Sequence, residues 1–64
     1  MKLTIEIECD NAAFDDDLAA EIDAVLDRVK RRFRKTYYSA PGYLIDGTCR
    51  DSNGNGCGFW KLEP

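Results

Sequence analysis

The stretch RDSNGNGCGFW, from Arg50 to Trp60, decides how the C-terminal part of this chain folds, because its centre fits two different structures. The letters DSNGNG, from Asp51 to Gly56, fit the first six places of the calcium-loop pattern D-x-[DN]-x-[DN]-G. The same letters contain two Asn-Gly pairs, and Asn-Gly is the strongest short signal for a β-hairpin turn. The residues on either side distinguish a metal site from a turn.

The flanking residues favour the turn. A calcium loop needs a bidentate glutamate at its twelfth place, but counting from Asp51 that place is Leu62, and Glu63 comes one residue too late. A calcium loop also needs a helix on each side, whereas GYLIDGTCRD before the turn and CGFWKLE after it are rich in residues that form strands. The sequence therefore predicts a hairpin with a turn at Asn53–Gly56 and no bound metal.

Upstream of the hairpin, the apolar residues predict one strand and one helix. In KLTIEIEC, Lys2 to Cys9, apolar and polar residues alternate, which is typical of a half-buried strand. From Leu18 to Phe33 the apolar residues recur at spacings of three and four, which predicts an amphipathic helix that ends before Pro41. We expect a single α+β domain over residues 1–64, in the order β-α-β-β, with the helix packed on a small, mainly antiparallel sheet. The expected core consists of Leu3, Ile5, Ile7, Leu18, Ile22, Val25, Leu26, Val29 and Trp60.

Acidic and basic side chains are separated along the chain, although the formal net charge is only −3. Residues 1–27 hold one lysine and nine carboxylates, whereas residues 28–64 hold eight basic and three acidic side chains. The two parts therefore carry formal charges of −8 and +5. Such a dipolar molecule can attract a charged partner of either sign.

The composition argues against an enzyme. The chain has no histidine, which is the side chain most often used as a base or nucleophile activator near neutral pH. Arrangements of the Cys-His and Ser-His-Asp types are therefore excluded. A chain of 64 residues also has little room to enclose a substrate pocket. We expect a non-enzymatic protein with no catalytic residues and no cofactor.

The cysteines and the apolar runs bear on the cellular location. Cys9, Cys49 and Cys57 are an odd set without a C-x-x-C pair, so they predict neither a disulfide framework nor a zinc site. Reduced cysteines are typical of the cytoplasm. The N-terminal MKLTIEIECD has charges where a signal peptide has its apolar stretch, and no apolar run approaches the roughly 18 residues of a membrane span. We expect a cytoplasmic protein that does not enter a membrane.

Two charged surfaces are candidates for contact with a partner. The basic run Arg28–Tyr38 combines six basic residues with three aromatic ones, which is a common arrangement for binding phosphates and stacking bases. The second candidate is an acidic surface formed by carboxylates of the first 23 residues, which can imitate the spaced negative charge of a nucleic-acid backbone. Each surface also has an ordinary explanation, because basic residues suit the end of a helix and carboxylates keep a protein soluble. The acidic candidates are Glu6, Glu8, Asp10, Asp15, Asp16, Asp17, Glu21 and Asp23.

Two motifs, DNAAF at Asp10–Phe14 and D-x-N-G-N at Asp51–Asn55, give the chain a resemblance to a family of short phage and prophage proteins. The resemblance covers Met1 to about Val29 and Thr48 to Leu62, whereas the segment Lys30–Gly47 departs from the family. Most members of the family have no known function. The resemblance implies a small phage-encoded accessory protein that acts in the cytoplasm of a bacterial host, a setting in which acidic proteins of this size are often inhibitors of host defence, including anti-CRISPR proteins.

These observations lead to one functional hypothesis and two alternatives. We expect a monomeric protein that binds and inhibits a host protein complex, such as a CRISPR-Cas surveillance complex or nuclease, by presenting its acidic surface as a mimic of DNA. The first alternative is a small nucleic-acid-binding or regulatory protein that uses the basic helix end, residues 28–35. The second is a phage protein with a structural role.

Overall fold

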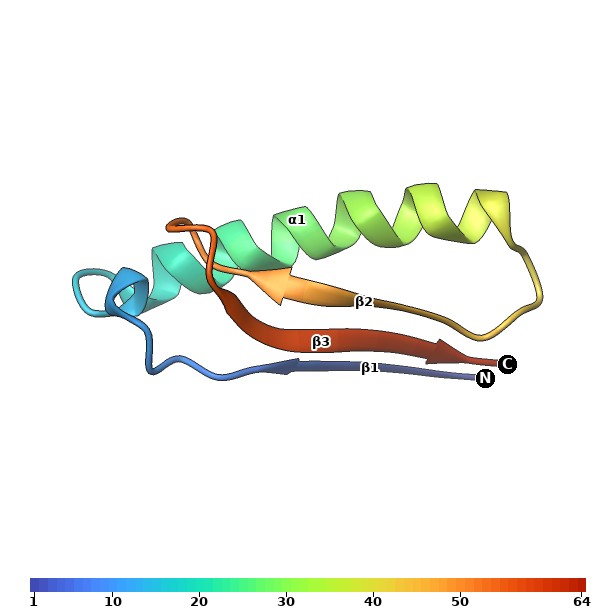
Figure 1. Cartoon of the computed structure of the whole chain (residues 1–64), viewed down its shortest axis with the longest axis horizontal. Coiled ribbons are helices and arrows are strands. Elements are labelled where there is room, and N and C mark those ends of the chain that lie inside the picture. Colours follow the sequence, from blue (N-terminus) through green and yellow to red (C-terminus); the bar gives the residue numbers. More distant parts are fainter.

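The computed structural model describes all 64 residues and shows a three-stranded sheet with one helix on one of its faces (Figure 1). The middle strand is antiparallel to both of its neighbours, and the strand order is β1-β3-β2. The predicted α+β class and β-α-β-β order are confirmed. In chain order the elements are β1 (Lys2–Ile7), the 3-10 helix η1 (Ala12–Phe14), α1 (Leu18–Ser39), β2 (Ile45–Arg50) and β3 (Gly56–Glu63).

Local chemistry sets both ends of α1. The side chain of Asp17 accepts a hydrogen bond of 3.0 Å from the backbone N–H of Ala20, so the last of three consecutive aspartates is the N-cap. At the other end, Ala40 donates its N–H to the carbonyls of Thr36 and Tyr37. Pro41 follows and cannot continue the helix. The helix therefore ends where the sequence predicts.

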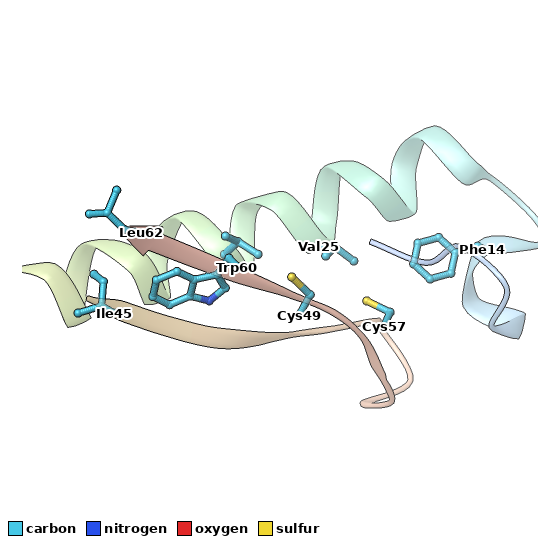
Figure 2. Packing of buried hydrophobic residues seen from close by; sticks show 8 residues of the cluster. Phe14, Val25, Ile45, Cys49, Cys57, Trp60 and Leu62 are labelled. Carbon is cyan, nitrogen blue, oxygen red and sulfur yellow. The ribbon is translucent and has the colours of Figure 1, made fainter. Parts of the chain in front are cut away.

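The core is centred on Trp60, which is completely buried between the sheet and α1 (Figure 2). Val25 and Val29 face it from the helix, and the ring of Phe33 meets the indole edge-on with 5.8 Å between the ring centroids. Cys49 and Cys57 also lie in this core, where they pack as small apolar residues. The buried apolar residues are Phe14, Val25, Val29, Ile45, Cys49, Cys57, Trp60 and Leu62.

The expected core is correct only in part. Val25, Val29 and Trp60 are buried as predicted, and Ile7 and Ile22 are half-buried. The prediction is wrong for the other members, which are exposed: Leu3 (50%), Ile5 (39%), Leu18 (50%) and Leu26 (41%).

The position of the helix explains this difference. Leu3 and Ile5 lie opposite Leu62 and Trp60 in the β1–β3 register, so they share the sheet face on which the helix lies. However, α1 packs against β2, at the far side of the sheet from β1 (Figure 1). A single helix placed over β2 leaves the apolar row of β1 uncovered.

Two glycines allow the close approaches on which this arrangement depends. A Cβ atom on Gly47 would lie 2.3 Å from Nε1 of Trp60, so only glycine leaves room in β2 for the indole ring. A Cβ atom on Gly58 would lie 1.8 Å from the backbone oxygen of Glu6, so only glycine lets β3 approach β1 at this point. These two residues bring the three strands and the tryptophan into contact.

Candidate interaction surfaces

The turn between β2 and β3 is organised by the carboxylate of Asp51, which is only 3% exposed. Its Oδ1 accepts hydrogen bonds from the N–H groups of Asn53 at 2.9 Å and Asn55 at 3.0 Å. The N–H of Gly54 donates to the backbone oxygen of Asp51 at 3.0 Å. The side chain thus closes a local turn, which is why aspartate is favoured at such positions. The predicted hairpin is confirmed, but its turn lies two residues earlier than the predicted Asn53–Gly56, at Asp51–Gly54, because Gly56 already belongs to β3. Its lack of bound calcium stays a prediction.

The surroundings of Asp51 favour its ionised form. Burial raises its pKa, but the hydrogen bonds from Asn55, Asn11 and Asn53, together with the charge of Arg28, outweigh that effect and hold the pKa below its ordinary value. No three or more His, Cys, Asp or Glu side chains lie together in a way that could hold a metal ion. The carboxylate is used for hydrogen bonds within the protein.

The DNAAF and D-x-N-G-N motifs, which lie far apart in the sequence, meet at this carboxylate. The side-chain amide of Asn11 donates to Oδ2 of Asp51 at 2.9 Å and to the backbone oxygen of Gly56 at 3.4 Å. Three residues later, Phe14 is buried in the core. Both motifs therefore have a structural role, which is to join the segment after β1 to the β2–β3 hairpin.

Glu21, one of the eight acidic candidates, lies inside the protein. It is buried, and its Oε2 and Oε1 accept hydrogen bonds from the backbone N–H and the hydroxyl of Ser52, at 2.8 Å and 2.7 Å. The sequence contained a signal of this, because Glu21 lies four residues before Val25 and eight before Val29, on the same helix face. Glu21 fixes the hairpin to α1, and we leave it out of the candidate surface.

The other seven acidic candidates are exposed and belong to the last part of β1, the segment after it and the first two turns of α1, which lie toward one end of the molecule (Figure 1). None of them forms an ion pair. Three of them line a shallow depression of about 340 Å³ beside the start of β3, and Asp17 also caps α1. We call this set the acidic end: Glu6, Glu8, Asp10, Asp15, Asp16, Asp17 and Asp23.

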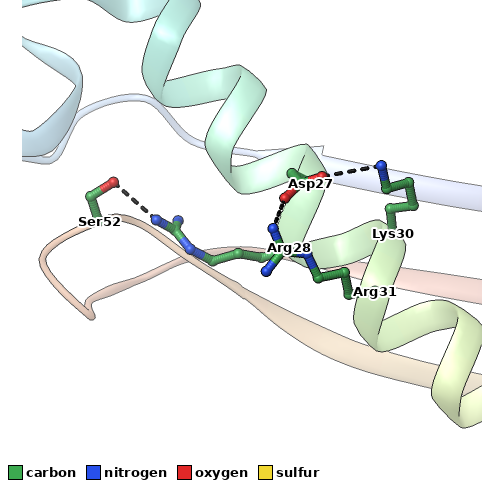
Figure 3. A network of polar contacts seen from close by, with 5 residues as sticks. All are labelled: Asp27, Arg28, Lys30, Arg31 and Ser52. Atoms are coloured by element: carbon green, nitrogen blue, oxygen red, sulfur yellow. Dashed lines mark hydrogen bonds and ion pairs between the residues drawn. The ribbon is translucent and has the colours of Figure 1, made fainter.

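Many of the basic side chains, by contrast, have partners within the protein. The carboxylate of Asp27 forms an ion pair with Nζ of Lys30 at 3.1 Å and a second ion pair with Arg31 (Figure 3). The hydrogen bond from Lys30, together with the charges of both basic groups, outweighs the opposing effect of burial and lowers the pKa of Asp27. Arg28 donates to the hydroxyl of Ser52 and to a backbone oxygen of β2, each at 3.0 Å. Three of the six basic side chains of α1 are therefore already engaged within the protein, although the exposed pairs with Asp27 add little stability.

A groove between α1 and β2 nevertheless has a basic lining. It has a volume of about 450 Å³, and Arg28, Arg32 and Arg50 line it together with Asp46. Arg32 has neither a hydrogen bond nor an ion pair, so its guanidinium group remains free for an anion. The sequence placed the basic residues on one helix but gave no indication that Arg50 joins them.

Comparisons with family models, curated proteins and solved structures find no match.

No helix combines the length and the apolar character that a membrane span requires. The acidic end offers free charge on open surface, whereas the basic groove has a defined shape but is partly neutralised.

Proposed function

We propose that this protein is a non-enzymatic accessory protein that binds and inhibits a host defence complex through its acidic end. The observation that supports this proposal is the set of seven exposed carboxylates without ion-pair partners, gathered at one end of a domain 39 Å long. Charges that stabilise a fold usually have partners, as Arg28, Lys30 and Arg31 of α1 do. Unpaired like charges in one place instead favour a partner with a positive surface.

The placement of these carboxylates suits a groove that binds DNA. Glu6 and Glu8 are two residues apart in an extended segment, so their side chains are on the same side and about 7 Å apart. Asp10 continues the row into the depression beside β3. Such a row resembles the regularly spaced negative charge along a nucleic-acid strand. A protein groove that is built for DNA would therefore attract it.

The resemblance to short phage proteins supplies the biological setting of this proposal. A phage protein made in a bacterial cytoplasm meets CRISPR-Cas surveillance complexes and nucleases, whose DNA grooves are basic. Occupying such a groove blocks DNA without any chemical step. A binding function also agrees with a chain that has no histidine and only shallow surface depressions.

The proposal is tested with two matched charge-reversal variants. In the first, Glu8, Asp15 and Asp16 are changed to Lys; none of these side chains makes a hydrogen bond or ion pair. In the second, Arg32, Arg34 and Lys35 are changed to Glu. DNA binding by a purified CRISPR surveillance complex is measured with each protein added, after circular dichroism has shown that both are folded.

We expect the acidic-end variant to lose inhibition and the helix variant to keep it. Inhibition by the natural protein should also weaken as salt is added, because the attraction is screened. The opposite result, with inhibition lost only in the helix variant, would exclude mimicry by the acidic end.

The groove between α1 and β2 supports a second candidate function, the binding of nucleic acid. Arg28, Arg32 and Arg50 converge there from two elements that are far apart in the sequence. Single-stranded nucleic acids commonly bind along grooves of this kind. A gel shift of labelled DNA that disappears with Arg32→Glu and persists in the acidic-end variant would favour this function over the first.

A further inference from the structure

The two edges of the sheet differ in how they are protected from other strands. On the β2 side of the sheet, the ladder between β2 and β3 shifts register between Cys49 and Arg50, and Asp46 is the second residue of β2. The side chain of Arg28, from α1, also donates a hydrogen bond to the backbone oxygen of Arg50 in β2. Irregular register, charged residues and a covering side chain are the usual means by which an edge strand avoids pairing. The β2 edge has all three, whereas β1 has only the charged residues, Lys2 and Glu6.

The β1 edge has an unbroken register over the whole strand, with no proline and no covering element. Along a strand, the N–H and C=O groups of successive residues point alternately to one side and the other. Glu8, just beyond the strand, points toward β3, because its N–H donates to the backbone oxygen of Cys57 at 2.7 Å. By that alternation, Glu6, Thr4 and Lys2 turn their hydrogen-bonding groups toward β3. Leu3 and Ile5 then turn theirs outward, where no strand of this chain can meet them. These two residues are also the exposed apolar ones, at 50% and 39%.

We propose that a second copy of this chain covers this edge, with β1 pairing antiparallel to β1 of the other copy. The strand is complementary to itself in one register, in which Thr4 lies opposite Thr4 of the second copy. Leu3 then lies opposite Ile5, and Lys2 lies opposite Glu6, in both directions, which leaves the other six carboxylates of the acidic end free. Neither Lys2 nor Glu6 has an ion-pair partner within its own chain, and opposite charges directly across two strands stabilise the pair.

This arrangement forms a closed dimer with a six-stranded sheet. A two-fold axis through the Thr4 pair uses the same surface on both copies, which is the commonest symmetry of protein dimers. The outward N–H and C=O groups of Leu3 and Ile5 are exchanged within the new ladder. Their side chains form a continuous apolar row across the junction. This dimer differs from the monomer that is expected from the sequence.

Charge exchange tests this register by sedimentation of the natural protein and its variants. Lys2→Glu and Glu6→Lys each place two pairs of like charges across the junction, and each should weaken the dimer at least about tenfold. The double variant Lys2→Glu/Glu6→Lys restores both pairs in reversed order, so it should dimerise again. Asp46→Lys, at the β2 edge, is the control and should leave the dimer unchanged.

Cross-linking tests the same register by geometry. Opposed residues that are not hydrogen-bonded have Cα atoms about 4.5 Å apart, a separation that a disulfide can bridge. In a Cys9→Ser background, Thr4→Cys should therefore yield a covalent dimer on mild oxidation. Thr48→Cys, an exposed threonine on the β2 edge, should not. A natural protein that sediments as a monomer at all concentrations, a cross-link only at Thr48→Cys, or single and double charge variants that behave alike would each overturn the proposal.

Discussion

At the scale of single residues, Asp51 shows how one buried carboxylate can join distant parts of a small chain. It closes the hairpin through Asn53 and Asn55 and holds the segment after β1 through Asn11. The sequence indicated the turn, because Asn-Gly pairs and a leading aspartate are local signals. It gave no indication of the contact with Asn11, because that contact depends on how the whole chain folds.

Replacing Asp51 with Asn should destabilise the protein in a pH-dependent way. The folded-state pKa of Asp51 is below its ordinary value, so its contribution is complete above the unfolded pKa of about 3.9 and is lost as the pH falls through the folded pKa. The difference in free energy of unfolding between the natural protein and Asp51→Asn should therefore be large at about pH 7 and shrink toward about pH 3. Urea unfolding at several pH values measures it.

Gly58 should tolerate no side chain, although alanine ordinarily suits a strand better than glycine. Gly58→Ala places a Cβ atom against the backbone of Glu6, and inserting a methyl group where there is no room typically costs about 1–3 kcal/mol. Gly56→Ala is the matched control, because a Cβ atom there meets only Thr48, at 3.9 Å. Thermal melting should show a large loss for Gly58→Ala and little change for Gly56→Ala. Equal melting temperatures would mean that β1 and β3 are not in such close contact.

At the scale of the elements, the periodicity of the sequence predicts the type and order of the helix and strands, but not where the helix lies on the sheet. Alternation identified β1, and spacings of three and four identified α1, because each pattern depends only on local geometry. The position of α1 over β2 depends on Trp60 and Gly47, which meet only in the folded protein. The sequence predicts neither a disulfide nor a zinc site for Cys49 and Cys57, and the expected core leaves them out, although both are buried there. Burial in fact raises the pKa of both thiols.

Two neighbouring helix residues test the placement of α1. Val25 is completely buried, so Val25→Ala should cost about 2 kcal/mol in the free energy of unfolding. Leu26 is 41% exposed, so Leu26→Ala should cost about 1 kcal/mol or less, and not the 2–5 kcal/mol of a core leucine that the sequence suggested. Urea unfolding of both variants measures the difference. A larger loss for Leu26→Ala would mean that α1 presents a different face to the sheet.

At the scale of the whole molecule, the distribution of charge distinguishes what stabilises the fold from what is free to bind. Three carboxylates have partners within the protein. Asp51 bonds within the hairpin and to Asn11, Glu21 bonds to Ser52, and Asp27 pairs with basic side chains of α1. The acidic end has no such partners. The sequence could count these charges and locate them in the first half of the chain. It could not show that Glu21 is structural, because that required the position of Ser52.

The acidic end should therefore cost stability instead of adding to it. Glu8 and Asp10 lie near Glu6 around one depression without a compensating cation, and like charges at such separations repel until salt screens them. Glu8→Gln/Asp10→Asn should raise the melting temperature at low ionic strength, and the gain should disappear at high salt. A matched pair at the basic groove, Arg32→Gln/Arg50→Gln, should give no comparable gain, because Arg50 donates to the oxygen of Gly54 and so stabilises the hairpin.

If the acidic variant instead melts lower at low salt, its carboxylates stabilise the fold, and the main support for a binding role of the acidic end is lost. If it melts higher, the chain keeps unfavourable charge at one end, as expected of a surface that serves a partner.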